Sequence, residues 1–317
     1  MGAGYGFAGS IGFAKESSGG TPVTVTSFLE ALSENITDTI DRFETKNITN
    51  DYAEPDDQDG IHRVAGNVVA AVHPTEVGHF LLGAMGINSI TLATSLYTHE
   101  FTMRSTEWDT KFPLQPYTFE VFRDVTSAQQ YAGVNVNTLE FNVAPNQDLR
   151  MTAGLIGVSA ANVDETTASF TATPAKVMAF DTASIAIGGS AAAKMEALTI
   201  SINNQLEGVP VLNNSTNVAK FRRTGFQTIR LSGTLSFEDI TEYLDFQNQT
   251  ERQITASFFR SNSFSIGFDL PRVVYTAYPL GISGRGRQTI SFEGMARKHV
   301  GSGNAIKVTL KNTTASY

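Results

Sequence analysis

The sequence predicts a mainly β protein built from two tandem β-sandwich or barrel domains, each with one flanking α-helix. Of the 317 residues, 41% are hydrophobic and only 17% are charged, a balance that excludes a largely disordered chain. Residues 117–122 and 306–310 alternate apolar and polar side chains with the period of a β-strand. Segments of the first half of the chain also recur in the second half, which indicates an internal duplication.

The duplication begins with two anchors that share one spacing. Residues 29–32 (Leu-Glu-Ala-Leu) recur as residues 195–198 (Met-Glu-Ala-Leu), a shift of 166 residues (195 − 29). Residues 75–76 (Thr-Glu) recur as residues 241–242 at the same shift (241 − 75). The anchors predict that these segments occupy equivalent places in two similar domains. A general likeness between Thr-rich strands is the alternative interpretation.

Further along the chain the spacing falls, which places an insertion in the first copy. Gly157 matches Gly294 at a shift of 137 residues (294 − 157). Lys176 then matches Lys307 at a shift of 131 residues (307 − 176). The first copy therefore carries about 29 extra residues (166 − 137), which we place near residues 86–130.

Each copy is expected to run from strands through one amphipathic helix to further strands. In the first copy, apolar residues at helical spacing predict a helix over residues 74–85. The apolar stripe of this helix consists of Val77, Phe80, Leu81 and Ala84. In the second copy, Ser236 is the predicted N-cap of a helix that reaches Phe246, with Asp239 three residues after the cap.

These elements divide the chain into three parts. Residues 1–26 form a Gly-rich N-terminal arm, residues 27–185 the first β domain with its insertion near 86–130, and residues 186–317 the second β domain. The small residues at 187–194 make a natural junction. We expect the start of the arm to order against a neighbouring molecule. We also expect the strand edges to pair with other copies, because an exposed edge is a template for pairing.

Three motifs suggest chemistry, and each has a simpler structural interpretation. Residues 4–9 match G-x-G-x-x-G, but no strand precedes them to build a dinucleotide site. Residues 57–60 (Asp-Gln-Asp-Gly) lack the later glutamate of a calcium-binding loop. Residues 283–287 (Ser-Gly-Arg-Gly-Arg) have the composition of a phosphate contact, but their place between two strands favours a hairpin turn.

The remaining residues assemble no site. No nucleophile, base and oxyanion donor occur in a known pattern, and the five histidines form no metal-ligand motif. The absence of cysteine excludes disulfides and thiolate ligands. We therefore predict no catalytic, cofactor-binding or metal-binding residues, no cofactor and no enzymatic activity. No apolar run approaches the ~18 residues of a membrane span, so no membrane partner is expected, and the net charge of −8 argues against a basic groove for nucleic acid.

Several segments share a pattern with one protein family. Residues 4–16 read Gly-Tyr-Gly-Phe-Ala-Gly-Ser-Ile-Gly-Phe-Ala-Lys-Glu, followed by Gly-Thr-Pro at 20–22 and Ser-Glu-Asn at 33–35. Residues 231–239 and 268–271 fit the same pattern. The chain in this respect resembles the major tail tube proteins of long-tailed, siphovirus-like bacteriophages.

The resemblance implies a structural virion protein in which six domains form a ring and rings stack into the tube for DNA ejection. Because this chain carries two copies of the domain, the expected ring contains three chains. The implied partners are other copies of the chain, double-stranded DNA that passes without sequence-specific binding, and the tape-measure and tail-terminator proteins. The implied location is the phage tail, after assembly in the cytoplasm of the bacterial host. The acidic balance fits a conduit wall that repels phosphate.

A two-domain β-sandwich binding module is the alternative function, for example a carbohydrate-binding or tail-tip protein. A module of that kind would present exposed aromatic side chains, because flat rings supply rigid contact area for a ligand. The candidate platform consists of Trp108, Tyr117 and Tyr131, and it is the feature that would favour the alternative.

Overall fold

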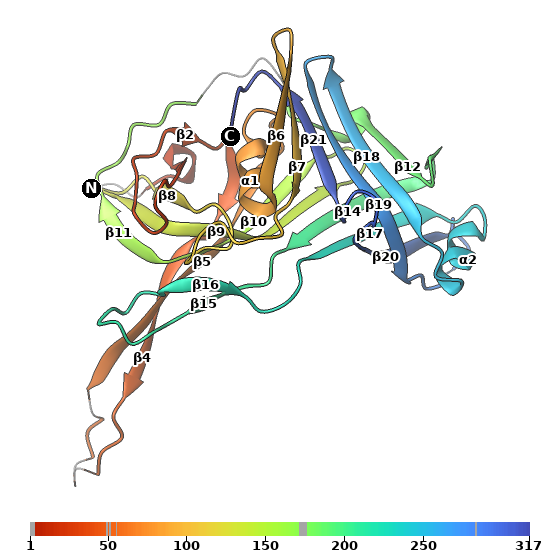
Figure 1. Ribbon diagram of the computed structural model, residues 1–317. Helices are drawn as coiled ribbons and strands as arrows, with labels where there is room; N and C mark the ends of the chain where they lie inside the picture. Colours follow the sequence, from red (N-terminus) through yellow and green to blue (C-terminus); the bar gives the residue numbers. More distant parts are fainter. Residues whose placement is uncertain (1–3, 49, 51, 55, 171–175, 283) are drawn as a thin grey trace.

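The computed structural model describes residues 4–48, 50, 52–54, 56–170, 176–282 and 284–317 (Figure 1). The described chain is mainly β, with large antiparallel sheets and two α-helices, which confirms the predicted fold class. The strands of the first half are β1 (Ser10–Lys15), β2 (Ser27–Phe28), β3 (Ala31–Glu34), β4 (Thr37–Glu44), β5 (Asp57–Ala71), β6 (Gly86–Ala93), β7 (Leu96–Met103), β8 (Tyr117–Phe122), β9 (Ala128–Val143), β10 (Arg150–Gly157) and β11 (Ser159–Val163). Those of the second half are β12 (Ala183–Ile187), β13 (Ser190–Ala191), β14 (Met195–Asn203), β15 (Leu206–Val209), β16 (Lys220–Arg223), β17 (Thr228–Ser236), β18 (Arg252–Ser261), β19 (Phe264–Ala277), β20 (Thr289–Ala296) and β21 (Lys307–Asn312).

The two helices lie where the sequence predicts them. Helix α1 (Val77–Met85) buries the predicted apolar stripe, and it ends at Gly86, which adopts φ +86° and donates its N–H to the carbonyl of Leu82. Helix α2 (Thr241–Gln247) begins later than predicted. The predicted N-cap, Ser236, is wrong, because it is still part of strand β17. The carboxylate of Asp239 instead accepts the N–H of Thr241 at 2.8 Å, next to the start of the helix.

One long sheet runs through both halves of the chain. Its strands follow the order β3 and β4, then β5, β10, β9, β14, β17 and β20, all antiparallel to their neighbours. The two halves meet where β9 pairs with β14, with Phe141 opposite Ile200. The hydrogen-bonded sheet therefore continues without interruption from the first half into the second.

A second sheet covers one face of the first. Its order is β6, β7, β21, β19, β18 and β12, so the hairpin that follows α1 is joined to the last strand of the chain. Strand β19 belongs to both sheets, because Ser265–Asp269 pair with β21 whereas Val273–Ala277 pair with β20. The β6–β7 hairpin lies in the region where the repeat spacing places an insertion.

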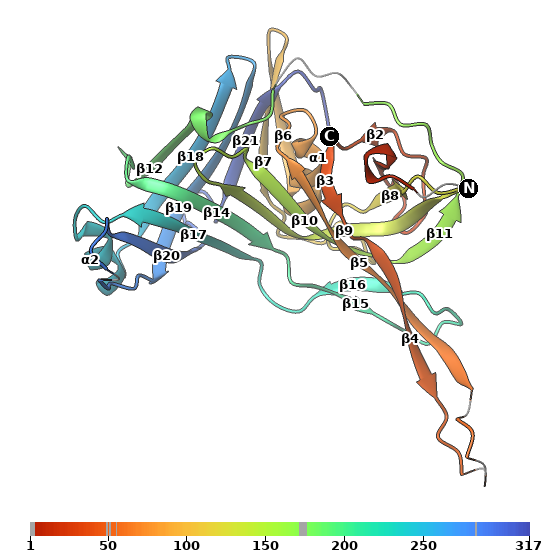
Figure 2. The same cartoon turned by 180° about the vertical axis from the view of Figure 1, so that it is seen from behind.

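The hydrophobic core lies between the two sheets and is continuous across both halves. At its centre, Phe141 of β9 contacts Phe268 of β19, with 4.8 Å between the ring centroids. Helix α1 packs between β9 and β7 on the buried face of the long sheet. The opposite face of the long sheet is partly covered by the β15–β16 hairpin, which lies beside β5 in both views (Figures 1 and 2). There Ile61 of β5 and Ile156 of β10 pack against a small cluster of Phe112, Val218 and Phe221.

The N-terminal segment differs from the flexible arm that the composition suggests. Residues 10–15 form strand β1, which pairs with β8 and places Phe13 in the core at 1% exposure. The segment that follows is fixed by the buried carboxylate of Glu16, which accepts the N–H groups of Gly20 and Gly133 and the hydroxyl of Thr118. Residues 11–14 are all buried, so the strand is covered on both faces, and Gly12 lies close to Val25 and Phe28. Residues 1–3 of the expected arm lie outside the described residues.

Candidate assembly surfaces

The long sheet ends on one side at strand β3, whose outer edge is open. Among the described residues β3 pairs with β5 alone, and the side chain of Leu32 is 58% exposed at this edge. The sequence repeat matches residues 29–32 to residues 195–198 of β14, and β14 has a second neighbour, because its outer edge pairs with β9. The edge of β3 is therefore unpaired, whereas the matching strand β14 uses that edge to pair with β9. An edge of this kind is a template for a further strand.

A groove of about 820 Å³ runs beside the open edge. Its floor and walls come from β3, the N-terminal segment and the end of β8, and they include Leu29, Leu32, Phe7, Ile11, Val121 and Phe122. Phe7 is 88% exposed and stacks on Tyr5. The position of β3 is fixed by Arg123, which bonds the carboxylate of Glu34 at 2.8 Å and the carbonyl of Ile36 at 2.9 Å. The edge and its groove therefore form a concavity lined by both apolar and polar side chains.

The other end of the long sheet is open as well. Strand β20 pairs with β17 along its whole length, but with β19 only from Glu293 onward. The chain between β19 and β20 leaves the sheet after Ala277, so Thr289–Phe292 have no described strand on that side. In this departing segment Leu280 and Ile282 are 43% and 82% exposed. Both ends of one continuous sheet are thus available for pairing with another chain.

A two-stranded arm made by β4 and the first half of β5 projects from the body of the molecule (Figure 2). Ion pairs lie along its strands: Arg63 bonds Asp41 at 2.7 Å, and Arg42 bonds Asp57 at 3.1 Å. Residues near the tip are fully exposed, including Tyr52. Exposed surface ion pairs contribute little to stability, so the arm depends mainly on the backbone pairing of β4 with β5.

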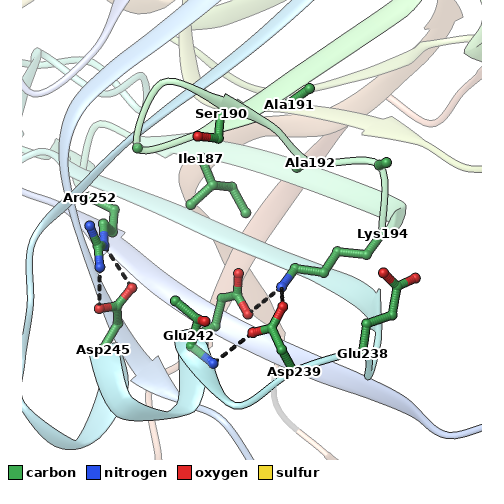
Figure 3. Close-up of a pocket in the computed structure, with 13 residues that line it drawn as sticks. Ile187, Ser190, Ala191, Ala192, Lys194, Glu238, Asp239, Glu242, Asp245 and Arg252 are labelled. Carbon is green, nitrogen blue, oxygen red and sulfur yellow. Dashed lines mark hydrogen bonds and ion pairs between the residues drawn. The ribbon is translucent and has the colours of Figure 1, made fainter.

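Charged side chains gather in a pocket beside helix α2 (Figure 3). Its volume is about 400 Å³. Lys194 donates to Asp239 at 2.9 Å and to Glu242 at 2.7 Å, and the hydrogen bond from Lys194 holds the pKa of Asp239 at about 2. Arg252 donates two hydrogen bonds of 2.7 Å each to the carboxylate of Asp245. Each of these three carboxylates has a cationic partner, so the pocket is an ion-pair joint between α2, β18 and the segment after β13.

Removing one member of this joint is expected to destabilise the fold. Asp245 has a side chain only 7% exposed, so Arg252→Gln would leave a buried carboxylate without its cation. We expect thermal unfolding to show a loss of about 1–3 kcal/mol. The double variant Asp245→Asn/Arg252→Gln should recover part of that loss, since it leaves no unpaired charge. Equal stability of Arg252→Gln and the wild type would show that the pair contributes nothing.

Two half-buried titratable groups, Glu76 and His79, lie at the start of helix α1, beside the C-terminal residue. Burial, with a smaller effect of Glu30, raises the pKa of Glu76 to about 7, and one of its carboxylate oxygens has no hydrogen-bond partner. Burial lowers the pKa of His79 to about 4. Tyr317 lies against His79, with 5.0 Å between ring centroids, and fills the space above Gly78. The C-terminus is thereby attached to the helix by packing.

The Glu76 carboxyl makes stability depend on pH. Because its pKa rises on folding from 4.5 to about 7, its favourable contribution is complete below pH 4.5 and is lost as the pH rises to about 7. We expect Glu76→Gln to raise the free energy of unfolding by about 1–3 kcal/mol at pH 8 and to change it little at pH 4. Urea titrations at the two pH values measure this. A gain of the same size at both values would contradict the assignment.

The motifs considered from the sequence fall into ordinary structural roles. Residues 6–8 form a short 3-10 helix that leads into β1, with no helix after it to receive a pyrophosphate. Residues 57–60 belong to strand β5 and pair with β4, so they form no calcium loop. Of the loop 283–287, Ser283 lies outside the described residues, and Arg287 is paired with Glu196. In the described part of the chain, no three His, Asp or Glu side chains are grouped to hold a metal ion.

The aromatic platform that would favour a binding module does not exist. Tyr117 and Tyr131 are buried, at 2% and 1% exposure, and Trp108 is half-buried against a small separate cluster. The hydroxyl of Tyr131 donates to the carbonyl of Ile36 at 2.9 Å, so this ring supports the β3 end of the sheet.

The sequence gives only a weak signal for the open strand edges, because the residues of an open edge alternate between apolar and polar in the same way as those of a covered edge.

Comparison with known proteins gives one clear result. No helix in the described residues has the length and apolarity needed to cross a membrane. No curated protein matches the chain. A family model described as "Phage tail tube protein" matches residues 6–296, which is nearly the whole chain and includes the sheet with its two open ends. The chain therefore belongs to the phage tail tube protein family, as a structural subunit of the tail.

Proposed function

We propose that three copies of this chain close into a ring, that the rings stack into the tail tube of a siphovirus-like phage, and that phage DNA leaves through the bore. In this proposal residues 27–185 and 186–317 act as two tandem tube domains, with residues 1–26 leading into the first. Each ring then holds six domains. Assembly takes place in the bacterial cytoplasm, and the protein acts in the virion without catalysis or a cofactor.

The observation that carries the proposal is the pairing of β9 with β14 inside one chain. It joins the two proposed tube domains through a continuous sheet. The same kind of junction between chains needs one open edge at each end of that sheet, and β3 and β20 supply them. The exposed Ile282, in the segment that leaves the sheet before β20, is an apolar residue that a neighbouring chain would cover.

A neighbouring chain also has a place to dock. The groove beside β3 lies at the open edge and is lined by apolar side chains. We propose that residues 278–282 of one chain extend along β3 of the next, in the way that β9 extends along β14. A head-to-tail contact of this type closes into a ring when the rotation between successive chains divides the circle evenly.

Stacking of rings requires contacts along the axis. The projecting arm of β4 and β5 reaches away from the body and is the candidate for this contact. The tape-measure and tail-terminator proteins would meet the bore and the end of the tube, respectively. The binding-module function loses its main support because the aromatic platform is buried.

Negative-stain microscopy of the concentrated, purified protein tests the proposal. We expect rings or tubes whose number rises with protein concentration. Monomers that persist at every concentration, and that bind glycans on an array, would contradict the proposal and support the binding module.

A further inference from the structure

We infer that Arg285 of one chain binds Glu30 at the open edge of β3 in the next chain, and that this ion pair selects which edges of the sheet meet. The inference rests on the proposed function, because it concerns a contact between two copies of the chain. It goes further by naming the two charged side chains that recognise one another. It also gives a role to the Gly-Arg-Gly-Arg sequence at 284–287.

The junction inside the chain shows what lies beside the matching glutamate. The repeat aligns residues 29–32 with residues 195–198. Glu30 therefore corresponds to Glu196. Glu196 lines a small pocket at the junction of the two halves, and Pro145, from the connection between β9 and β10, lines the same pocket. A carboxylate at this position of the repeat thus faces the connection that follows the neighbouring strand.

The second half of the chain has an equivalent connection, between β19 and β20. Strand β9 pairs with β10, and β19 pairs with β20, each in an antiparallel hairpin. A proline stands two residues after the end of β9 and of β19, at Pro145 and Pro279. The first connection covers residues 144–149 and the second covers residues 278–288, which makes the second longer by five residues (11 − 6). A junction between chains that repeats the junction within the chain brings this longer connection, with Arg285, to Glu30 of the next chain.

Glu30 has no cationic partner in the part of the chain that the structure describes. It is exposed and lines the groove beside β3. The arginine of this groove, Arg123, is paired with Glu34. Burial lowers the pKa of His73, although Glu30 acts in the opposite direction, so this nearby ring is uncharged at neutral pH. Glu76 also lies close, because the charge of Glu30 adds to the effect of burial in raising the pKa of that carboxyl. The end of β3 therefore carries a negative charge that no described cation offsets.

Arg285 is the cation that the other end of the sheet offers. It is exposed, and it forms no ion pair with another described residue. On one side of it, Arg287 is bound to Glu196 of the same chain. On the other side, Ile282 belongs to the segment that extends along β3 of the next chain in the proposed ring. Arg285 thus lies where the two chains meet. A charge pair at such a place favours the correct partner, because like charges brought together there oppose a wrong one.

A DNA phosphate is the other ligand that a loop of this composition could bind. The contact with Glu30 is favoured for two reasons. The loop lies at an open end of the long sheet, where another chain is expected. Its second arginine, Arg287, is already paired, so only Arg285 remains for phosphate. One arginine displaces about one counterion from a duplex, which gives little affinity.

Exchanging the two charges tests the contact. Arg285→Glu and Glu30→Arg each bring like charges together, so the critical concentration for assembly, measured by sedimentation, should rise about tenfold or more for either variant. The double variant Arg285→Glu/Glu30→Arg restores opposite charges and should assemble within about threefold of the wild type. Both side chains are exposed, so thermal unfolding of the free subunits should not change. The control, Lys298→Glu, reverses an exposed cation beyond the other end of β20 and should assemble like the wild type.

Cross-linking shows whether the pair joins two chains. Because the chain has no cysteine, Glu30→Cys and Arg285→Cys each introduce a single thiol. The two variants are mixed, assembled and treated with a short bismaleimide, which spans a longer distance than a disulfide. We expect covalent dimers that contain one chain of each variant. Their yield should be about tenfold or more above that from a mixture of Glu30→Cys with Lys298→Cys.

The results that would overturn the inference differ from those that would overturn the proposed function. If tubes form and the double variant assembles no better than Arg285→Glu or Glu30→Arg, the two residues do not form a pair, although the proposed function survives. If Arg285→Glu assembles like the wild type but its tubes no longer retain a DNA duplex at low salt, the loop binds phosphate instead. If the wild-type protein forms no rings or tubes at any concentration, the proposed function itself fails.

Discussion

Replacing Leu32 with lysine is expected to prevent tube formation without unfolding the subunit. Leu32 is 58% exposed at the open edge of β3, so the folded monomer should change in stability by no more than about 0.5 kcal/mol. A lysine on an edge strand disfavours pairing, because the charge must be desolvated when a second strand covers it. The critical protein concentration for assembly, measured by sedimentation, should rise about tenfold or more.

The matched control for Leu32→Lys is Ser257→Lys, which adds the same charge to an exposed position on β18. This variant should assemble like the wild type, since β18 lies in the second sheet and away from both open ends of the long sheet. If Leu32→Lys assembles at the same concentration as the control, β3 is not a ring contact. Ile282→Lys tests the opposite end of the sheet, and it should raise the critical concentration for assembly as Leu32→Lys does.

Truncating Phe141 to alanine is expected to cause the largest loss of stability, about 3–5 kcal/mol. Phe141 is 2% exposed on β9, and its ring contacts that of Phe268 from the second half of the chain. The cavity left by the ring would lie at the junction of the two halves. Neither half alone can shift to fill it, so the loss of stability is large. Because the core is continuous, we expect both halves to unfold in one transition.

Calorimetry and denaturant titration followed by two probes measure this effect. The control, Phe259→Ala, removes a ring that is 57% exposed on β18 and should cost less than about 1 kcal/mol. Two separate transitions, of which Phe141→Ala shifts only one, would show that the halves fold independently.

Local patterns in the sequence were enough to predict the elements. Strand β20 buries every second side chain from Ile290 to Ala296, as alternation predicts, and α1 buries its apolar stripe. The start of α2 was misplaced, because Ser236 is an equally good cap in isolation but hydrogen-bonds in the β17 ladder instead. At Ser236, strand pairing therefore outweighs the local preference for a helix cap.

The arrangement of the elements could not be predicted in the same way. The pairing of β9 with β14, and of β7 with β21, joins residues far apart in the chain, and alternation does not specify a partner strand. For the same reason the sequence did not identify residues 10–15 as a strand. Their small side chains resemble those of a linker, and only the pairing with β8 shows that they form β1. Net charge alone also does not say where the charge lies along the chain: residues 34–59 carry nine acidic and two basic residues, −7 (2 − 9) of the total −8.

The rotational symmetry of a single ring, determined by cryo-electron microscopy of end-on views, tests the central proposal most directly. Three chains per ring are expected, with six similar lobes, a continuous sheet around the bore, and β3 of each chain against the segment that precedes β20 of the next. A ring of six chains, or contacts between chains that leave both ends of the long sheet exposed, would contradict it.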